Sequence, residues 1–211
     1  MIETFAITLV GVAAAQASPG PNLVAVASAA LAQGRRAGLV VTSGVATGML
    51  IWALAVSFGL GALFTAYPVS LLALKLAGGL YLLWLGLKGL RAAWIGRAAS
   101  LGAADRRRSD LQNWRRGLFV ILTNPKAALM WAAVATFLFG QGLATWQVAA
   151  FGPVGALSGF AIYGSYALLF STGTAGRFFR RFARATEAVF GAAFGLFGAS
   201  LIRDGVSTLR H

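Results

Sequence analysis

The chain has 211 residues, of which 58% are hydrophobic and 11% charged, against about 25% charged residues in typical soluble proteins. It contains no cysteine and a single histidine, His211, which excludes disulfide frameworks, thiolate or histidine metal sites, and Cys–His or Ser–His–Asp catalysis. The formal net charge of +13 comes from basic residues in the short gaps between apolar runs. This pattern is typical of a polytopic membrane protein, and it argues against a nucleic-acid partner, an enzyme or a bound cofactor.

Six apolar runs approach the length of about 20 residues that a membrane-spanning helix needs. They cover residues 4–32, 39–64, 69–90, 118–139, 148–171 and 188–202. The last run has only 15 residues and would reach about 22 Å across a hydrocarbon core of about 30 Å, so five spans are an alternative. We predict an all-α, polytopic transmembrane helical bundle of about six spans that forms a single domain, residues 1–211.

Basic residues are distributed unequally over the gaps between these runs. The gaps after the first, third and fifth runs, counted together with Lys88 near the end of the third run, carry 14 Lys and Arg residues, whereas gaps 65–68 and 140–147 carry none. The positive-inside rule therefore places the basic gaps in the cytoplasm and both termini outside. The longest gap, residues 91–116, is rich in Ala, Ser and Arg, and we expect a flexible connector that attracts anionic lipids.

The first run is interrupted near its middle by a proline-rich motif, Ser18-Pro19-Gly20-Pro21-Asn22. A proline inside a helix removes a hydrogen bond, so Pro19 frees the carbonyl of Ala15 and Pro21 frees that of Ala17. The helix should break here. Ser18 followed by proline is a favourable start signal, and we expect Ser18 to cap a second half-helix.

The fourth run contains a similar break, a capping residue followed by a proline, at Asn124-Pro125-Lys126. The chain therefore divides into two repeats, 1–90 and 117–211, joined by the basic connector 91–116. Because three spans separate the two breaks, the second repeat is expected to be inverted relative to the first, as in many transporters. Two half-helices that begin inside the membrane from opposite sides would direct positive dipole ends, roughly +0.5 charge each, toward a central site for an anionic group.

Lysines and tyrosines add further candidates for this site. A lysine inside a membrane is costly, and Lys126 lies about 12 Å beyond the start of its run, so we expect it to contact a substrate. Lys75 is closer to the end of its run, where snorkelling competes with a functional role. Tyr163 and Tyr166 place hydroxyl groups deep in the fifth run.

The glycine content, 27 of 211 residues, includes pairs at the spacing of close helix packing. These pairs are Gly44/Gly48, Gly155/Gly159 and Gly191/Gly195. The spacing is compatible with packing inside the chain, with a homo-oligomer, or with an alternative function as an integral membrane scaffold in which the two breaks are only kinks.

Four motifs, taken in order, connect the chain with a known family. They are Ser18-Pro19-Gly20-Pro21-Asn22, Gly34-Arg35-Arg36-Ala37-Gly38 with Gly44 and Gly48, Lys75-Leu76-Ala77-Gly78-Gly79-Leu80-Tyr81-Leu82 with Leu85-Gly86, and Asn124-Pro125-Lys126. With these motifs the chain resembles the LysE/RhtB family of bacterial amino-acid exporters over nearly its full length. The resemblance implies an inner-membrane secondary transporter of about six spans that moves amino acids out of the cytoplasm, driven by the proton-motive force.

The absence of a carboxylate from the interior of the runs bears on substrate and coupling. Glu3 and Glu187 lie at run ends, so a cationic substrate side chain would have no buried partner, and we expect a neutral amino acid such as homoserine, threonine or leucine. The freed carbonyls would hold its ammonium group, and the half-helix ends with Lys126 its carboxylate. Coupling would use a titrating Lys126 or Lys75, a proton carried by the substrate, or no proton at all.

Overall fold

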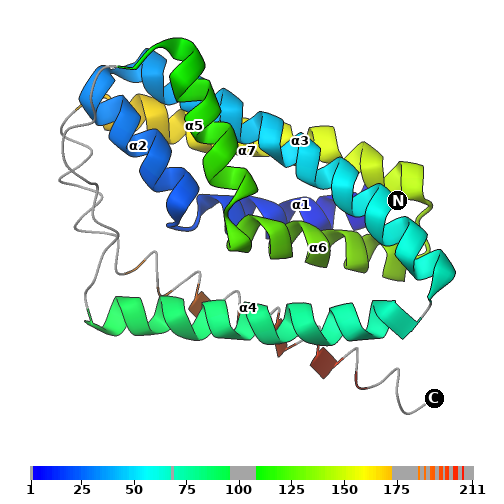
Figure 1. Ribbon diagram of the computed structural model, residues 1–211. Helices are drawn as coiled ribbons and strands as arrows, with labels where there is room; N and C mark the ends of the chain where they lie inside the picture. Colours follow the sequence, from blue (N-terminus) through cyan, green and yellow to red (C-terminus); the bar gives the residue numbers. More distant parts are fainter. Residues whose placement is uncertain are drawn as a thin grey trace.

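The structure is a computed structural model that describes residues 2–67, 69–95 and 108–172 and isolated positions between 185 and 206. Within the described residues all regular elements are helices (Figure 1). They are α1 (Ile2–Ala17), α2 (Pro21–Gln33), α3 (Arg35–Ala66), α4 (Val69–Ile95), α5 (Asp110–Leu122), α6 (Pro125–Gly140) and α7 (Thr145–Phe170). The all-α prediction is confirmed for this part of the chain.

The two predicted breaks both occur, and each produces a sharply bent helix pair. Helices α1 and α2 meet at 55°, and α5 and α6 meet at 60°. Asn124 caps α6 as expected, because its side-chain oxygen accepts the backbone N–H of Lys126 at 3.0 Å. The expectation for Ser18 is wrong: α2 begins two residues later than predicted, at Pro21, after Gly20, and without a side-chain cap.

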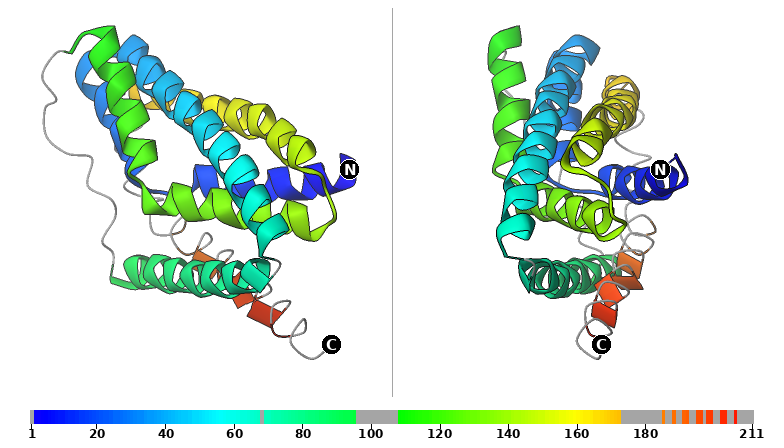
Figure 2. Two further views of the ribbon diagram at one scale, coloured as in Figure 1. Left: turned by 45° about the vertical axis from the view of Figure 1, so that its right-hand side comes forward. Right: turned by 90° about the vertical axis from the view of Figure 1, so that its right-hand side faces the viewer.

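Helices α3 and α7 form the centre of the bundle and pack along each other (Figure 2). Helix α5 packs on α3 and α1 packs on α7, while α2 contacts both α3 and α7, so each bent pair reaches the long helix of the other half. The core contains the fully buried side chains of Met49, Trp131 and Phe151. Helix α4 lies beside α6, on one side of this core (Figure 1).

Glycines bring several of these helices close together. A Cβ atom at Gly44 in α3 would overlap the carbonyl oxygen of Trp114 in α5, and one at Gly117 in α5 would overlap that of Val41 in α3. On α4, a Cβ at Gly86 would lie 2.7 Å from the carbonyl oxygen of Gly191. The glycine spacing is thus used for packing within the chain.

The described residues include two helices that are long and apolar enough to cross a membrane. These are Arg35–Leu63 within α3 and Thr145–Phe170, and there are up to four spans if each bent pair counts as one. Apolar side chains such as Leu54, Phe58 and Leu157 are exposed on these helices, as expected for surfaces that face lipid. The predicted sixth span, 188–202, is described only at isolated positions, so the count of six stays a prediction.

The prediction of a connector over residues 91–116 is wrong at both ends. Helix α4 continues to Ile95, and α5 already begins at Asp110. A capping box starts α5: the Ser109 hydroxyl accepts the Gln112 N–H at 3.3 Å, while the Gln112 side chain accepts the Ser109 N–H at 2.9 Å. Residues 96–107 lie outside the described part of the chain.

Candidate functional site

The two helix breaks meet at a small cavity in the centre of the bundle. The cavity has a volume of about 20 Å³, room for a water-sized group. Its lining combines carboxamide, hydroxyl and ammonium groups with apolar side chains: Ala15, Gln16, Ser18, Gly20, Asn22, Met49, Ile121, Asn124, Lys126, Ala127, Met130 and Tyr163. The motifs of the two halves, about a hundred residues apart in sequence, thus share one site.

The first residues of two half-helices, α2 and α6, lie at this cavity. Each helix starts with a proline, and the next residue, Asn22 in α2 and Lys126 in α6, lines the cavity. Because backbone N–H groups at a helix start have no partner within the helix, both ends present positive partial charge to the same space. The predicted convergence of two half-helix ends therefore exists in the fold.

A chain of side-chain hydrogen bonds links the two ends. The Asn124 amide nitrogen donates to the Asn22 oxygen at 3.3 Å, and the Asn22 nitrogen contacts the Tyr163 hydroxyl at 3.4 Å. All three residues are buried. This arrangement fixes α2, α6 and α7 relative to one another at the cavity.

Lys126 is half-buried, and its ammonium group lies across the cavity from its own helix. Its Nζ atom donates to the Ser18 hydroxyl, and a Cβ atom at Gly20 would lie 3.7 Å from it. The positive charge therefore sits beside the start of α2 as well as at the start of α6. An anion that entered the cavity would meet one formal charge and two helix ends.

The carbonyl groups that the prolines free accept other hydrogen bonds, contrary to the expectation that they stand open to a substrate. The Ala15 oxygen accepts the Ser18 hydroxyl at 2.9 Å, and the Ala17 oxygen accepts the Tyr166 hydroxyl at 2.8 Å.

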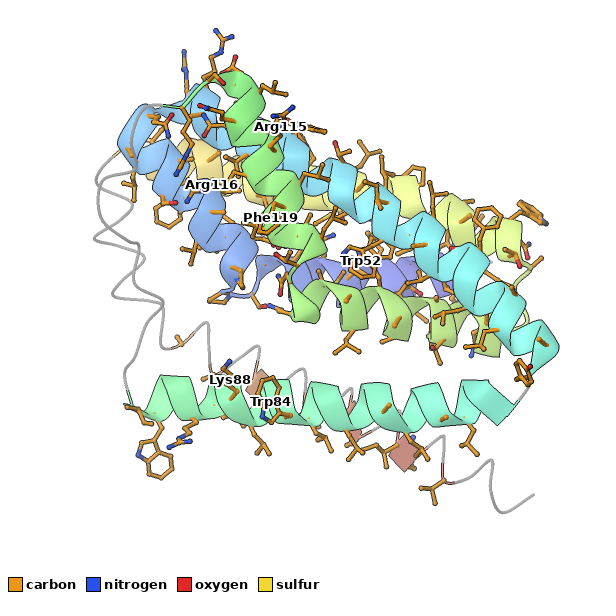
Figure 3. All side chains as sticks on the ribbon, viewed as in Figure 1. Trp52, Trp84, Lys88, Arg115, Arg116 and Phe119 are labelled. Atoms are coloured by element: carbon orange, nitrogen blue, oxygen red, sulfur yellow. The ribbon has the colours of Figure 1, made fainter. Side chains whose placement is uncertain are left out.

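At the second break the Ile121 oxygen accepts the Trp52 indole N–H at 3.2 Å (Figure 3). These side chains replace the missing helix bonds, as a broken helix in a membrane requires. The freed carbonyls stabilise the breaks in this conformation.

The sequence-predicted site residues separate into three groups. Ser18, Gly20, Asn22, Asn124, Lys126 and Tyr163 line the cavity. Pro19, Pro21 and Tyr166 are absent from the lining and act on the backbone around it, and Pro125 occupies the first position of α6. Lys75 lies in α4, none of whose described residues lines the cavity, and its side chain is outside the described part of the structure.

The sequence interpretation missed Gln16, whose side chain is almost fully buried beside the cavity. Its nitrogen donates to the Gly155 carbonyl at 2.8 Å, and its oxygen accepts the Ser158 hydroxyl at 2.8 Å. The signal was a single carboxamide in an otherwise apolar helix. Met49, Ile121 and Met130, which form the apolar part of the lining, carried no such signal.

Polar contacts join α2, α3 and α5 at the basic end of the bundle. Arg116 donates to the Ser28 hydroxyl at 2.9 Å, and the Gln33 oxygen accepts the Asn113 amide at 3.3 Å. Figure 3 shows Arg116 on the α5 helix, near α2. An exposed ion pair connects Arg36 and Asp110 at 2.7 Å. These contacts hold α2, α3 and α5 together at this end.

Comparison with known proteins connects the whole chain with membrane transporters. A family described as LysE type translocator matches residues 13–205. The threonine efflux protein of Escherichia coli (strain K12) is 29% identical over 189 residues, 88% of this chain and 90% of that protein.

Two further relatives are similar to the chain. An uncharacterized membrane protein of the same strain is 31% identical over 196 residues, 90% of this chain and 85% of that protein. The homoserine/homoserine lactone efflux protein of Salmonella typhi is 34% identical over 117 residues, 56% of this chain and 55% of that protein. No solved structure gives a significant match.

Proposed function

The chain belongs to the LysE type translocator family, and from this premise we propose that it exports a neutral amino acid from the cytoplasm across the bacterial inner membrane. The names of its relatives, threonine efflux protein and homoserine/homoserine lactone efflux protein, support an amino-acid substrate. The observation that carries the proposal is the cavity at which the starts of α2 and α6 meet with Lys126. The proposed binding of the substrate, the selectivity for its side chain and the movement of the helices are all based on this cavity.

The substrate carboxylate binds at the positive end of the cavity. Lys126 Nζ, now bonded to the Ser18 hydroxyl, turns to the carboxylate, and the helix starts at Gly20 and Asn124 supply dipole stabilisation. The oxygen atoms of Asn22 and Tyr163 accept hydrogen bonds from the ammonium group. All amino acids carry a carboxylate and an ammonium group, so this end of the cavity would recognise amino acids as a class.

The apolar end of the cavity selects the side chain. Met49, Ile121 and Met130 line it, and no Asp or Glu is among the lining residues that the structure describes. A lysine or arginine side chain would therefore be buried without a counter-ion, at a cost of several kcal/mol. A neutral side chain needs no counter-ion, and the carboxamide of Gln16 offers a partner for a hydroxyl group.

Transport requires the site to change shape. A cavity of about 20 Å³ accommodates a water molecule but no amino acid, so the site is closed to the substrate in this conformation. The two bent pairs, at 55° and 60°, are the elements that we expect to move when the site opens toward either side. The inverted repeat of 1–90 and 117–211 would make the two openings equivalent, and the proton-motive force would supply the energy.

Glycine contacts within the chain argue against the scaffold alternative. It relied on glycine faces that pack against a partner protein, whereas Gly44, Gly117, Gly86 and Gly191 pack against helices of the same chain. The polar cavity at the breaks has no role in a scaffold. We therefore favour the transporter.

Purified protein in proteoliposomes tests the proposal. Vesicles loaded with labelled threonine, homoserine, leucine or lysine should release the neutral amino acids faster than protein-free vesicles, and lysine no faster. An imposed proton gradient should accelerate release if the gradient drives export. Equal rates with and without protein, for every amino acid, would contradict the proposal.

A further inference from the structure

Buried serine and threonine hydroxyl groups among the described residues fall into two kinds. Four of them, on Thr8, Ser18, Ser28 and Thr42, donate to a carbonyl three or four residues earlier. Ser57 in α3 and Thr136 in α6, each 1% exposed, have no hydrogen-bond partner among the residues that the structure describes. A hydroxyl group left unpaired in a membrane protein costs free energy, so a second conformation or water must satisfy these two.

Packing contacts place Ser57 and Thr136 at the same level of the bundle. A Cβ atom at Gly61 in α3 would lie 3.2 Å from Phe139 in α6 and 2.9 Å from the Thr145 hydroxyl at the start of α7. Ser57 precedes Gly61 by one helical turn, and Thr136 precedes Phe139 by one turn. Both unpaired hydroxyls therefore lie about one turn inside the end of the bundle that carries the α6–α7 connection.

Along α6, Trp131 follows the cavity residue Met130 and precedes Thr136. Its ring, 1% exposed, lies against Gly155, whose carbonyl accepts the cavity residue Gln16. It meets Phe151 edge-on, with ring centroids 6.4 Å apart, and Phe151 meets Phe5 at 5.3 Å. The Trp131 indole N–H is also buried, with no hydrogen-bond partner in the described part of the chain.

We infer that the substrate leaves the central cavity between α3, α6 and α7, past Trp131 and along the hydroxyls of Ser57 and Thr136. The inference rests on the proposed export function. In the closed conformation the aromatic rings block this route and leave its polar groups unpaired. When the route opens, water and the amino and hydroxyl groups of the substrate become their partners.

The natural absence of cysteine makes the route directly testable by labelling. We would introduce Ser57→Cys and Thr136→Cys, with Phe58→Cys as a control at the same depth, because Phe58 is 58% exposed on the apolar outer surface. A charged, membrane-impermeant methanethiosulfonate would be added to the outer side of transporting vesicles. We expect labelling at positions 57 and 136, slowed by excess threonine or homoserine, and none at position 58.

The labelling and transport results separate the two proposals. Vesicles that transport, but whose positions 57 and 136 react no faster than position 58, would overturn the route and leave the export function intact. If the unmodified protein transports no amino acid, the proposed function fails, and the route as a substrate pathway fails with it.

Thr136→Val provides a second measurement, because valine has nearly the same shape but lacks the hydroxyl. We expect it to raise the thermal midpoint, since an unpaired group is removed, while export slows about 2- to 10-fold, the factor that corresponds to one hydrogen bond. Thr42→Val, which removes a hydroxyl bonded to Gly38 at 3.0 Å, should lower the midpoint and leave the rate unchanged. An unchanged export rate in Thr136→Val would argue against the route.

Discussion

The charge of Lys126 is the residue-scale feature on which substrate binding depends most. Lys126→Met keeps the bulk of the side chain and removes the charge, so the protein should fold while the apparent affinity for substrate falls about 10- to 150-fold, the equivalent of roughly 1.5–3 kcal/mol. Lys126→Arg should retain part of the affinity. The measurement is the concentration dependence of export, or of thermal stabilisation by threonine.

Lys88→Met is the matched control for this substitution. Lys88 lies in α4, with its Nζ 5.0 Å from the centre of the Trp84 ring, and takes no part in the cavity (Figure 3). Its loss should leave the affinity unchanged. If Lys126→Met and Lys88→Met behave alike, Lys126 is a structural residue, and the carboxylate must bind elsewhere.

Individual site residues were predictable where local chemistry marks them. Prolines and a lysine are conspicuous in an apolar run, and this pattern identified Asn22, Asn124 and Lys126, which the structure places together. Gln16 was missed because its hydrogen-bond partners, Gly155 and Ser158, lie 139 and 142 residues away. A pattern within one helix cannot identify partners at that distance, nor could it show that the Tyr166 hydroxyl would occupy a freed carbonyl.

At the scale of an element, the break between α1 and α2 should be required for transport and not for folding. The double substitution Pro19→Ala, Pro21→Ala restores two backbone N–H donors, so α1 and α2 should merge into a straighter helix. We expect the protein to remain in the membrane with export abolished, because the start of α2 no longer lies at the cavity. Membrane fractionation and vesicle export measure the two effects.

A proline elsewhere provides the control for this double substitution. Pro153 lies inside α7, is exposed, and is absent from the cavity lining. Pro153→Ala also restores a helix donor, and export should continue. Undiminished export by the double variant would mean that the bend is only a kink.

Helix α3 should not tolerate a side chain at Gly44, where it contacts α5, but should tolerate one at Gly59. Gly44→Ala would place a methyl group on the Trp114 carbonyl, so α5 must shift, at a cost of about 1–3 kcal/mol. Gly59→Ala, with no atom within 4 Å of the new Cβ, should instead stabilise α3 by roughly 0.5–1 kcal/mol. Opposite shifts of the thermal midpoint in detergent are expected; equal shifts would contradict this packing.

The starts of the helices were predicted correctly only where the capping residue and the first residue of the helix were both identified. Proline and asparagine fixed the start of α6 correctly. The start of α5 was not predicted, because it directly follows a run of arginines that is typical of a loop. Ser109 and Gln112 nevertheless have the spacing of a capping box. For α2, both Pro19 and Pro21 are compatible with the first position of a helix, and the helix begins at Pro21.

For the whole molecule, hydrophobic runs predicted the helices but not their packing. Apolar surface faces either lipid or other helices, so the sequence cannot tell which long helix contacts which bent pair. The packing of α5 on α3 and of α1 on α7, each between the two halves, includes glycine contacts such as Gly44 with Trp114 and Gly159 with Gln16. The inverted repeat and the six spans remain predictions from sequence.

The orientation of the molecule follows from its charge distribution and can be tested at described positions. Leu111, 55% exposed on the first turn of α5, lies at the basic end, and Gln141, exposed after α6, lies at the end without Lys or Arg in its gaps. Because positively charged gaps stay in the cytoplasm, Leu111→Cys should be labelled by an impermeant maleimide only in inverted vesicles, and Gln141→Cys only in intact cells. Both should react after permeabilisation. Labelling of position 141 from the cytoplasmic side alone would reverse the orientation, and the route past Trp131 would then open inward instead of outward.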